Sequence, residues 1–306
     1  MHNHKSEITK QKKPSIQSRL MYSALKSMNF SERFFEKMLR KPARGNNRMA
    51  PRQFSKPIIV KESHIEGFQL LNLRTKKSTN RHIIVLHGGA YVAEAIKGHR
   101  HLCRQLVLKH NFKVSFIDYP LAPEYRASYT IKLVRKAFNK ISEENPDDEF
   151  LLLGDSAGGG LVLALLQILK AEQHPRIPEK TVLLSPWLDV SMSNPEIADY
   201  QNKDVLLNIS GLKACGKLYA RNLDLKSPEV SPIYGNLNGL SNIKIFVSTH
   251  ELFYPDCLLL KQKIDNATGS TTSLVIKEKL IHDWIVLPIP ERRETINEIA
   301  EFFKQG

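Results

Sequence analysis

The feature that most constrains the fold of this 306-residue chain is a short turn between an apolar strand and an apolar helix. The segment Gly154-Asp155-Ser156-Ala157-Gly158 follows the strand-like run FLLL and precedes the helix-like run LVLALLQILK. Gly-x-Ser-x-Gly in this context predicts a nucleophile elbow, where a strained turn presents the serine above a sheet. The neighbours must be small because the turn is tight. The N-terminus of the next helix offers an N–H group to a developing oxyanion.

Strand-like and helix-like runs alternate from residue 57 to the end of the chain. Continuous apolar strands such as IIVLH and FLLLG predict a mostly parallel sheet with helices on both faces, that is, an α/β fold. The first two strands have no helix between them, which predicts an antiparallel hairpin at the sheet edge. We expect strands at 57–61, 68–73, 82–87, 113–118, 150–154, 181–185, 244–248 and 273–277. We expect helices at about 95–110, 127–144, 157–172, 255–266 and 291–304.

Residues 1–56 differ from the rest of the chain in charge. They hold 14 Lys or Arg and three acidic residues, so most of the formal net charge of +14 lies there. Residues 1–14 are predicted to be a basic tail, 16–39 have apolar residues at helical spacing, and 41–56 are a polar linker. This uneven distribution, without interleaved aromatic residues, argues against a nucleic-acid binder. Within the later region, 191–239 interrupts the alternation as a long insertion with helical pieces.

The composition also indicates in which cell compartment the protein works and which cofactors it can hold. No window approaches 18 uncharged apolar residues, and no apolar stretch follows the basic N-terminus, so we expect neither a transmembrane helix nor a signal peptide. Cys103, Cys215 and Cys257 are scattered, which argues against a disulfide framework or a structural zinc site. We predict a cytoplasmic protein without a metal or an organic cofactor.

A second glycine-containing turn is predicted to bind a developing negative charge. His87-Gly88-Gly89-Ala90 ends the strand HIIVLH. Two glycines after a strand allow backbone N–H groups to turn into a cavity, as in an oxyanion hole. We therefore expect Gly88 and Gly89 to donate there together with the N–H of Ala157.

The serine needs a base, and with this elbow the chain order is serine, acid, histidine. Beyond the elbow lie only His174, His250 and His282. His174 comes too early, and His250 is expected to be a loop residue. His282 follows the strand-like run SLVIK by a short loop, so it is the expected base.

The acid should follow a late core strand. After the run IKIFVS comes Glu251, three residues past the strand, which suits an acid that orients an imidazole. Asp256 follows a proline and can instead cap the next helix. Glu251 is the expected acid, and Asp256 stays open as the alternative.

Taken in order, these segments resemble the hormone-sensitive-lipase-like branch of the α/β-hydrolases, which includes bacterial carboxylesterases and acetyl-hydrolases. The matching pieces are HGGA at 87–90, DYPLAPE at 118–124, GDSAGG at 154–159, SPWLD at 185–189, SP at 231–232, ELFYPD at 251–256 and HDW at 282–284. The chain departs from the pattern at Pro120, where Arg is usual, at Ala90, where a third glycine is common, and at Glu251, where Asp is usual.

The resemblance implies an α/β-hydrolase fold with a helical cap. The cap would comprise an N-terminal segment within 1–56 and an insertion at 191–239 of the catalytic domain, which spans 57–306. Asp118, Tyr119 and Glu124 would support the site from behind, and we assign the same role to His87 and Asp155. Dimers are common among such relatives.

The expected function is hydrolysis of small carboxylic esters of short to medium acyl length, with Ser156 as nucleophile, His282 as base and Glu251 as acid. The same residues could serve an amidase, a lactonase or a sugar deacetylase. A non-catalytic ligand-binding protein on a hydrolase scaffold is the alternative from another class. The basic helical segment in 1–40 has two interpretations, a cap helix or a helix that contacts an anionic membrane surface.

Overall fold

The computed structural model describes residues 13–40, 49–240 and 242–305. Within these residues, eight strands form one sheet in the order β1-β2-β4-β3-β5-β6-β7-β8. The strands are β1 (Ile59–Ile65), β2 (Phe68–Arg74), β3 (Arg81–Leu86), β4 (Lys113–Ile117), β5 (Glu149–Asp155), β6 (Lys180–Leu184), β7 (Asn242–Ser248) and β8 (Thr271–Lys277). The hairpin of β1 and β2 is antiparallel and lies at the edge, as expected, and β2 pairs antiparallel with β4. The remaining pairs are parallel.

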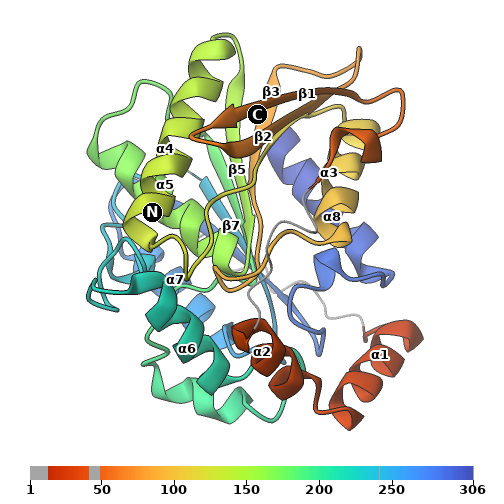
Figure 1. Ribbon diagram of the computed structural model, residues 1–306, viewed down its shortest axis with the longest axis vertical. Helices are drawn as coiled ribbons and strands as arrows, with labels where there is room; N and C mark the ends of the chain where they lie inside the picture. Colours follow the sequence, from red (N-terminus) through yellow and green to blue (C-terminus); the bar gives the residue numbers. More distant parts are fainter. Residues whose placement is uncertain (1–12, 41–48, 241, 306) are drawn as a thin grey trace.

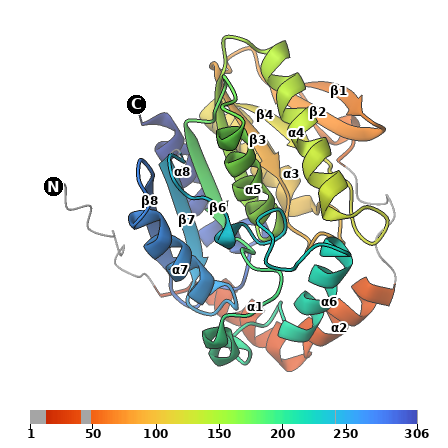
Figure 2. The same cartoon turned by 90° about the vertical axis from the view of Figure 1, so that its left-hand side faces the viewer.

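Helices cover both faces of the sheet. Helices α3 (Lys97–His110) and α8 (Glu291–Lys304) lie on one face, and α4 (Ala127–Glu144), α5 (Ala157–Ala171) and α7 (Tyr254–Asp265) lie on the other (Figures 1 and 2). Neighbouring strand residues point to opposite faces. Ile84 and Leu152 therefore join the core under α4 and α5, whereas Ile83 and Leu151 join the core under α3 and α8. This two-sided burial explains why the central strands are apolar at every position.

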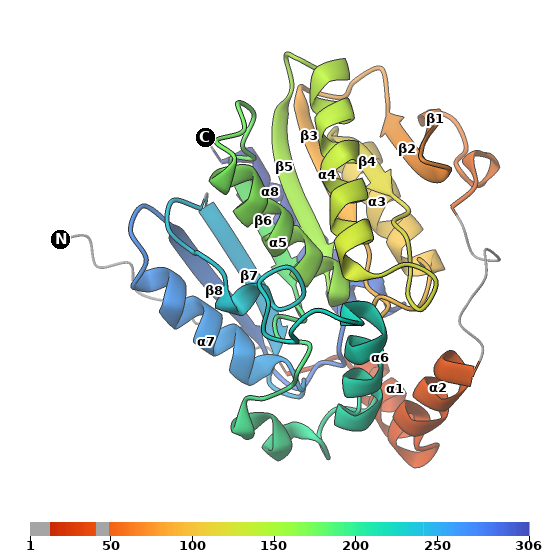
Figure 3. The same ribbon diagram turned by 60° about the vertical axis from the view of Figure 1, so that its left-hand side comes forward.

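Three helices, which correspond to the expected cap and are called the cap below, gather at one end of the molecule beyond the ends of the strands (Figure 3). Helices α1 (Ile16–Ser27) and α2 (Phe30–Arg40) come from the N-terminal segment, and α6 (Ile209–Ala220) comes from the insertion. The chain turns between α1 and α2 at Asn29, where φ is 47°. The remaining short helices are 3₁₀ turns at Pro51–Gln53, Pro195–Tyr200, Pro232–Tyr234 and Trp284–Val286.

Specific contacts attach the cap to the body. Ser18 Oγ at the start of α1 donates to Glu291 of α8 at 2.6 Å, and the backbone N–H of Ser15 donates to the same carboxylate, also at 2.6 Å. In α6, a Cβ placed on Gly211 would lie 2.3 Å from the ring of Phe35, so α2 and α6 approach closely there. The two cap segments therefore pack against each other, although Phe35 and Gly211 are 176 positions apart in the sequence.

The basic tail at 1–12 and the linker residues 41–48 lie outside the described residues. Within the described parts of the chain, no helix is long and apolar enough to cross a membrane. Cys103, Cys215 and Cys257 are all buried and free.

Candidate active site

The nucleophile elbow forms where β5 ends and α5 begins. Ser156 has φ 50° and ψ −120°, a conformation that costs energy and is held by its surroundings. Its N–H donates to the carbonyl of Leu184 at 2.8 Å. Two glycines permit the turn, since a Cβ on Gly154 would lie 2.3 Å from the carbonyl oxygen of Gly158, and one on Gly158 would lie 2.2 Å from that of Leu86. The spacing of the motif is therefore a packing requirement.

Replacing Gly158 by alanine tests this requirement. Glycine to alanine inside a helix normally stabilises a protein by about 1 kcal/mol. At Gly158 we expect the opposite, a loss of about 1–3 kcal/mol in the free energy of unfolding, because the new methyl group meets backbone atoms that cannot move aside. Urea unfolding of the two proteins measures the difference. An unfolding free energy equal to or above that of the wild type would contradict the close packing.

The structure brings together the three residues expected to form the triad. His282 Nε2 lies 3.1 Å from Ser156 Oγ, and His282 Nδ1 lies 2.7 Å from Glu251 Oε2. The other carboxylate oxygen of Glu251 accepts from Ser185 Oγ at 2.9 Å and from the N–H of Ser248 at 2.7 Å. The side chains of Ser156, His282 and Glu251 are all buried. The result is a continuous hydrogen-bonded chain from a fully satisfied carboxylate, through an imidazole, to the serine hydroxyl.

The parallel sheet explains this convergence. Ser156 follows β5, Glu251 follows β7 and His282 follows β8 through a short loop, so all three lie beyond the carboxyl ends of their strands. Asp256, the alternative acid, lies in the first turn of α7. It accepts a hydrogen bond from Asn194 Nδ2 at 2.9 Å and not from His282. Burial raises the pKa of Asp256 to about 6.

The loop after β3 corrects one expectation. The N–H of Gly88 donates to Asp155 Oδ2 at 2.8 Å. It is therefore not free to bind an oxyanion in the cavity, contrary to expectation. The next residues have positive φ angles, 128° at Gly89, 52° at Ala90 and 63° at Tyr91. Among the described residues, no acceptor is found for the N–H groups of Gly89 and Ala90. The N–H of Ala157 opens α5 and has no intrahelical acceptor.

A buried histidine and tyrosine hold this loop from behind. His87 Nδ1 donates to the carbonyl of Gly88 at 2.6 Å, and burial, with the nearby His99, lowers the pKa of His87 to about 4. Tyr119 stacks on the His87 ring, with centroids 4.4 Å apart, and its hydroxyl donates to the His87 carbonyl at 2.6 Å. Asp118 Oδ1 lies 3.8 Å from His87 Nε2.

Glu124 does not share this supporting position. Its side chain is exposed in the turn before α4, unlike the buried Asp118 and Tyr119. We expected Asp118, Tyr119 and Glu124 to support the site from behind. This expectation is wrong for Glu124. An exposed carboxylate at this turn is well solvated, which explains why it needs no buried partner.

Two supporting residues were missed from the sequence. His99 of α3 lies beneath the elbow, and its Nε2 donates to Asp155 Oδ2 at 3.0 Å. Asp204, in the insertion, accepts from the N–H of Leu252 at 3.0 Å and from the N–H of Leu207 at 2.9 Å, so it ties the cap to the loop of Glu251. Burial raises the pKa of Asp204 to about 6. Neither residue lies in a motif, so spacing along the chain gave no signal for them.

A mostly apolar pocket of about 460 Å³ opens onto the serine. The cap supplies Phe34, Phe35 and Met38 from α2 and Leu207 from the insertion, and the body supplies Ser156 and His282 with their loops. Phe35 and Met38 are the buried residues of α2, both line this pocket, and Phe35 also packs against Gly211 of α6. This placement supports the cap interpretation of that helix.

The cap also contacts the loop after β3 directly. The ring of Tyr91 stacks on Tyr219 of α6 with centroids 3.7 Å apart and an interplanar angle of 3°. Tyr91 also stacks on Trp187, which follows β6. Tyr91 follows Ala90 directly. The loop after β3 is therefore joined to α6 by this pair of stacked rings.

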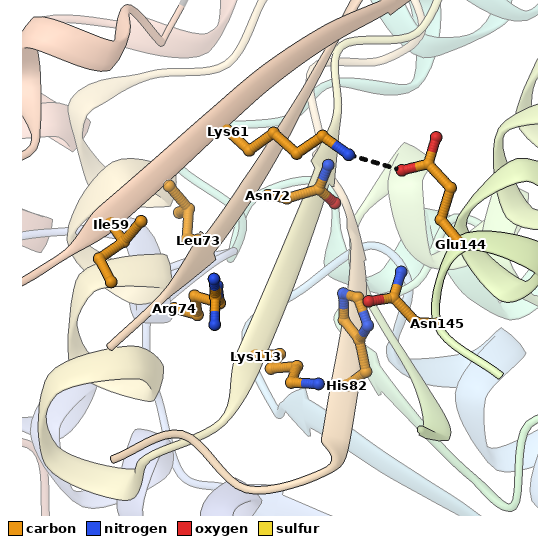
Figure 4. A pocket seen from close by; sticks show the side chains of 9 residues that line it. All are labelled: Ile59, Lys61, Asn72, Leu73, Arg74, His82, Lys113, Glu144 and Asn145. Atoms are coloured by element: carbon orange, nitrogen blue, oxygen red, sulfur yellow. Dashed lines mark hydrogen bonds and ion pairs between the residues drawn. The ribbon is translucent and has the colours of Figure 1, made fainter. Parts of the chain in front are cut away.

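A second serine–histidine–aspartate set lies at the opposite ends of the strands. His82 Nε2 is 2.7 Å from Ser115 Oγ, and its Nδ1 is 3.0 Å from Asp148 Oδ2, distances similar to those of the triad. His82 lines a separate pocket of about 270 Å³ with Asn72, Lys113 and the ion pair of Lys61 and Glu144 (Figure 4).

The surroundings distinguish the two sets. Ser115 lies within β4, fully buried, and its hydroxyl donates to Asn72 Oδ1. The strand pairs on both sides, so its N–H groups are engaged in the sheet, and no helix begins there. A nucleophile needs access and free N–H donors beside it. The set at His82 therefore serves as a buried polar network that joins β2, β3 and β4.

Comparison with known proteins agrees with this architecture. A model of the α/β hydrolase fold matches residues 83–286, roughly two thirds of the chain. The chain therefore belongs to the α/β-hydrolase fold family.

Among similar proteins, an esterase of Acinetobacter venetianus is 27% identical over 254 residues, which cover 80% of this chain and 82% of that one. An acetyl-hydrolase of Streptomyces hygroscopicus is 28% identical over 235 residues, covering 76% and 78%. The crystal structure of an esterase from the bacterial hormone-sensitive lipase family superposes with a TM-score of 0.80 at 23% identity, covering 96% of this chain and 99% of that one. The expected α/β-hydrolase fold and the class of carboxylesterase-type hydrolase are confirmed. The likeness to the structure from the hormone-sensitive lipase family is a likeness of fold.

Proposed function

We propose that this hydrolase cleaves carboxylic esters of short to medium acyl length through an acyl-enzyme on Ser156. The observation that carries the proposal is the hydrogen-bonded chain of Ser156, His282 and Glu251, whose first two members line an apolar pocket. The buried set at Ser115 has a similar hydrogen-bond pattern but lies within a paired strand, without free N–H donors beside the hydroxyl.

In the proposed reaction, Ser156 Oγ attacks the acyl carbon while His282 Nε2 takes the hydroxyl proton. Glu251 holds the ring through Nδ1 and stabilises the imidazolium that forms. The oxyanion is bound by the N–H groups of Gly89, Ala90 and Ala157, a set that omits Gly88. His282 then gives its proton to the leaving alcohol, and water repeats the attack on the acyl-enzyme, releasing the acid and restoring Ser156.

The preference for short and medium acyl chains follows from the pocket. Its volume of about 460 Å³ lies near the lower end of the range of small-molecule sites, and α2 closes one side of it. We expect kcat/KM for p-nitrophenyl esters to be highest for acetate or butyrate, lower for octanoate and lowest for palmitate. Initial rates on the four esters under identical conditions measure this. Highest activity on palmitate would contradict the proposed acyl preference while leaving ester hydrolysis intact.

Ser156, His282 and Glu251 could also cleave amides, lactones or acetylated sugars. Initial rates on an amide, a lactone and an acetylated sugar, measured beside the ester, distinguish these activities. A non-catalytic binding protein would react with none of them. In that case a fluorophosphonate probe distinguishes an inert serine from an active one, because only an activated Ser156 is labelled.

The remaining predictions on location and partners belong to the same proposal. Three buried, free cysteines are consistent with a cytoplasmic protein. The burial of Phe35 and Met38 beside the pocket of Ser156 favours the cap over the membrane interpretation of α2. Vesicle flotation at low and high salt would reveal any contact with anionic lipid, and light scattering would give the oligomeric state.

A further inference from the structure

A carboxylate lies beside the nitrogen of His282 that faces the nucleophile. Asp283 Oδ2 is 3.2 Å from His282 Nε2, and Ser156 Oγ is 3.1 Å from the same nitrogen. The other ring nitrogen, Nδ1, is engaged by Glu251 at 2.7 Å. The imidazole is therefore bracketed by two carboxylates, one at each nitrogen.

The backbone fixes Asp283 in this place. Its φ and ψ are 53° and 37°, a left-handed conformation that aspartate tolerates better than most residues. Its carbonyl accepts from the N–H of Val286 at 2.9 Å, and the adjoining Trp284 is buried with its Nε1 bonded to Thr295 at 2.8 Å. Asp283 Oδ1 is buried and has no hydrogen-bond partner among the described residues. The carboxylate therefore has its partner on one side only, at His282.

This arrangement affects the protonation of the base. His282 accepts the proton of Ser156 only when Nε2 carries no hydrogen. An ionised carboxylate at Nε2 stabilises the N–H form, in which the nitrogen is a donor and the hydroxyl proton has no acceptor. The same carboxylate stabilises the imidazolium that forms as Ser156 attacks. Asp283 therefore opposes release of the proton before the reaction and assists the charge that develops during it.

We propose, on the basis of the function proposed above, that Asp283 is a positioning residue that sets the pH range of the esterase by retaining the proton on His282 Nε2. The reaction then begins at a higher pH than a triad with Glu251 alone would allow.

The charges and burial around His282 and Asp283 agree with this role of Asp283. Burial lowers the pKa of His282, but the attraction of Asp283 and then of Glu251 outweighs it and holds that pKa well above its ordinary value. Burial also raises the pKa of Asp283, as does the charge of Asp155. The titratable and charged groups that face the pair or line its pocket are Glu251 and Asp204 beside the ring, Asp155 and His99 beneath the elbow, and Glu94 and Lys37 at the pocket.

Asp283→Asn tests the proposal because it keeps the shape and removes the charge. The acid limb of the pH profile of kcat/KM reports the pKa of the base in the free enzyme. With p-nitrophenyl butyrate at constant ionic strength, we expect this limb to move to lower pH by roughly one unit or more. The variant is then faster than the wild type at the acidic end. It is slower on the alkaline plateau, because it lacks the charge that stabilises the imidazolium, so the two profiles cross.

A matched control is Asp256→Asn, which removes another buried carboxylate that does not contact His282. The acid limb of its pH profile should stay in place.

An unchanged acid limb in Asp283→Asn, a shift of that limb to higher pH, or a uniform loss of kcat/KM at every pH would overturn the proposal. If Asp283→Asn does not fold, the His282 ring nitrogens of the labelled wild-type protein are titrated by NMR. An imidazolium lost near the unperturbed value of about 6.5 would then overturn it.

Failure of this inference and failure of the proposed function give different experimental results. Wild-type activity that depends on Ser156, together with an unmoved limb in Asp283→Asn, rejects only the role of Asp283. Folded wild-type protein without activity on any ester rejects the proposed function itself.

Discussion

Ser156→Ala is expected to lower kcat for ester hydrolysis by about 10⁶-fold, because the alanine cannot form the acyl-enzyme and His282 loses the hydroxyl that it activates. The fold should persist, since the N–H of residue 156 still donates to Leu184 and the hydroxyl is replaced by a smaller group. The measurement is kcat on p-nitrophenyl butyrate for both proteins, with circular dichroism and thermal unfolding as the control for folding.

A folded Ser156→Ala protein with more than a few per cent of wild-type activity would contradict the assignment of the nucleophile. The residual rate must be separated from contaminating esterases by fluorophosphonate labelling. Label on wild-type protein at Ser156, and none on the variant, connects the activity to this residue.

Glu251→Gln is expected to cost about 10⁴-fold in kcat, the effect of exchanging a triad acid for its amide. An amide can hold the ring in the wrong tautomer, with Nδ1 as acceptor and Nε2 protonated, so the base is disabled while the geometry is kept. The wild-type carboxylate also accepts from Ser185 and Ser248, and the glutamine oxygen can keep those contacts. The variant should therefore fold, and a kinetic loss would report the chemistry.

The matched variant for the acid is Asp256→Asn, which changes the residue that the sequence left open as an alternative. Its carboxylate contacts Asn194 and not His282, so kcat should remain within a few-fold of wild type. If instead Asp256→Asn were inactive and Glu251→Gln active, the two assignments would have to be exchanged.

Most of the fold could be predicted because both faces of its central strands are buried. Apolar runs such as IIVL and FLLL leave little choice but an interior strand, and the strand that precedes Ser156 determines where the elbow lies. The grouping of Ser156, His282 and Glu251 could be predicted because a parallel sheet brings the ends of its strands to one edge. For these residues, position relative to a strand is the signal, and that position is readable in the sequence.

The proposed oxyanion donors could not be predicted in the same way. Which N–H of the loop after β3 is free depends on Asp155, whose carboxylate engages Gly88 across 67 residues of sequence. His99 supports the same carboxylate from 56 residues away, within an ordinary amphipathic helix. Spacing arguments follow the chain, whereas these contacts depend on side-chain direction in the folded protein.

The shared stack of Tyr91 and Tyr219 limits how freely the cap can be exchanged. A lid is often regarded as an interchangeable module that selects substrates while a conserved body performs the reaction. Here a ring from α6 rests on the residue that follows Ala90, so the cap also forms part of the support of the reacting loop. A chimera that carries a foreign insertion without a flat ring at this place should lose turnover as well as change selectivity. We therefore expect substrate range and turnover to depend together on this pair of tyrosines.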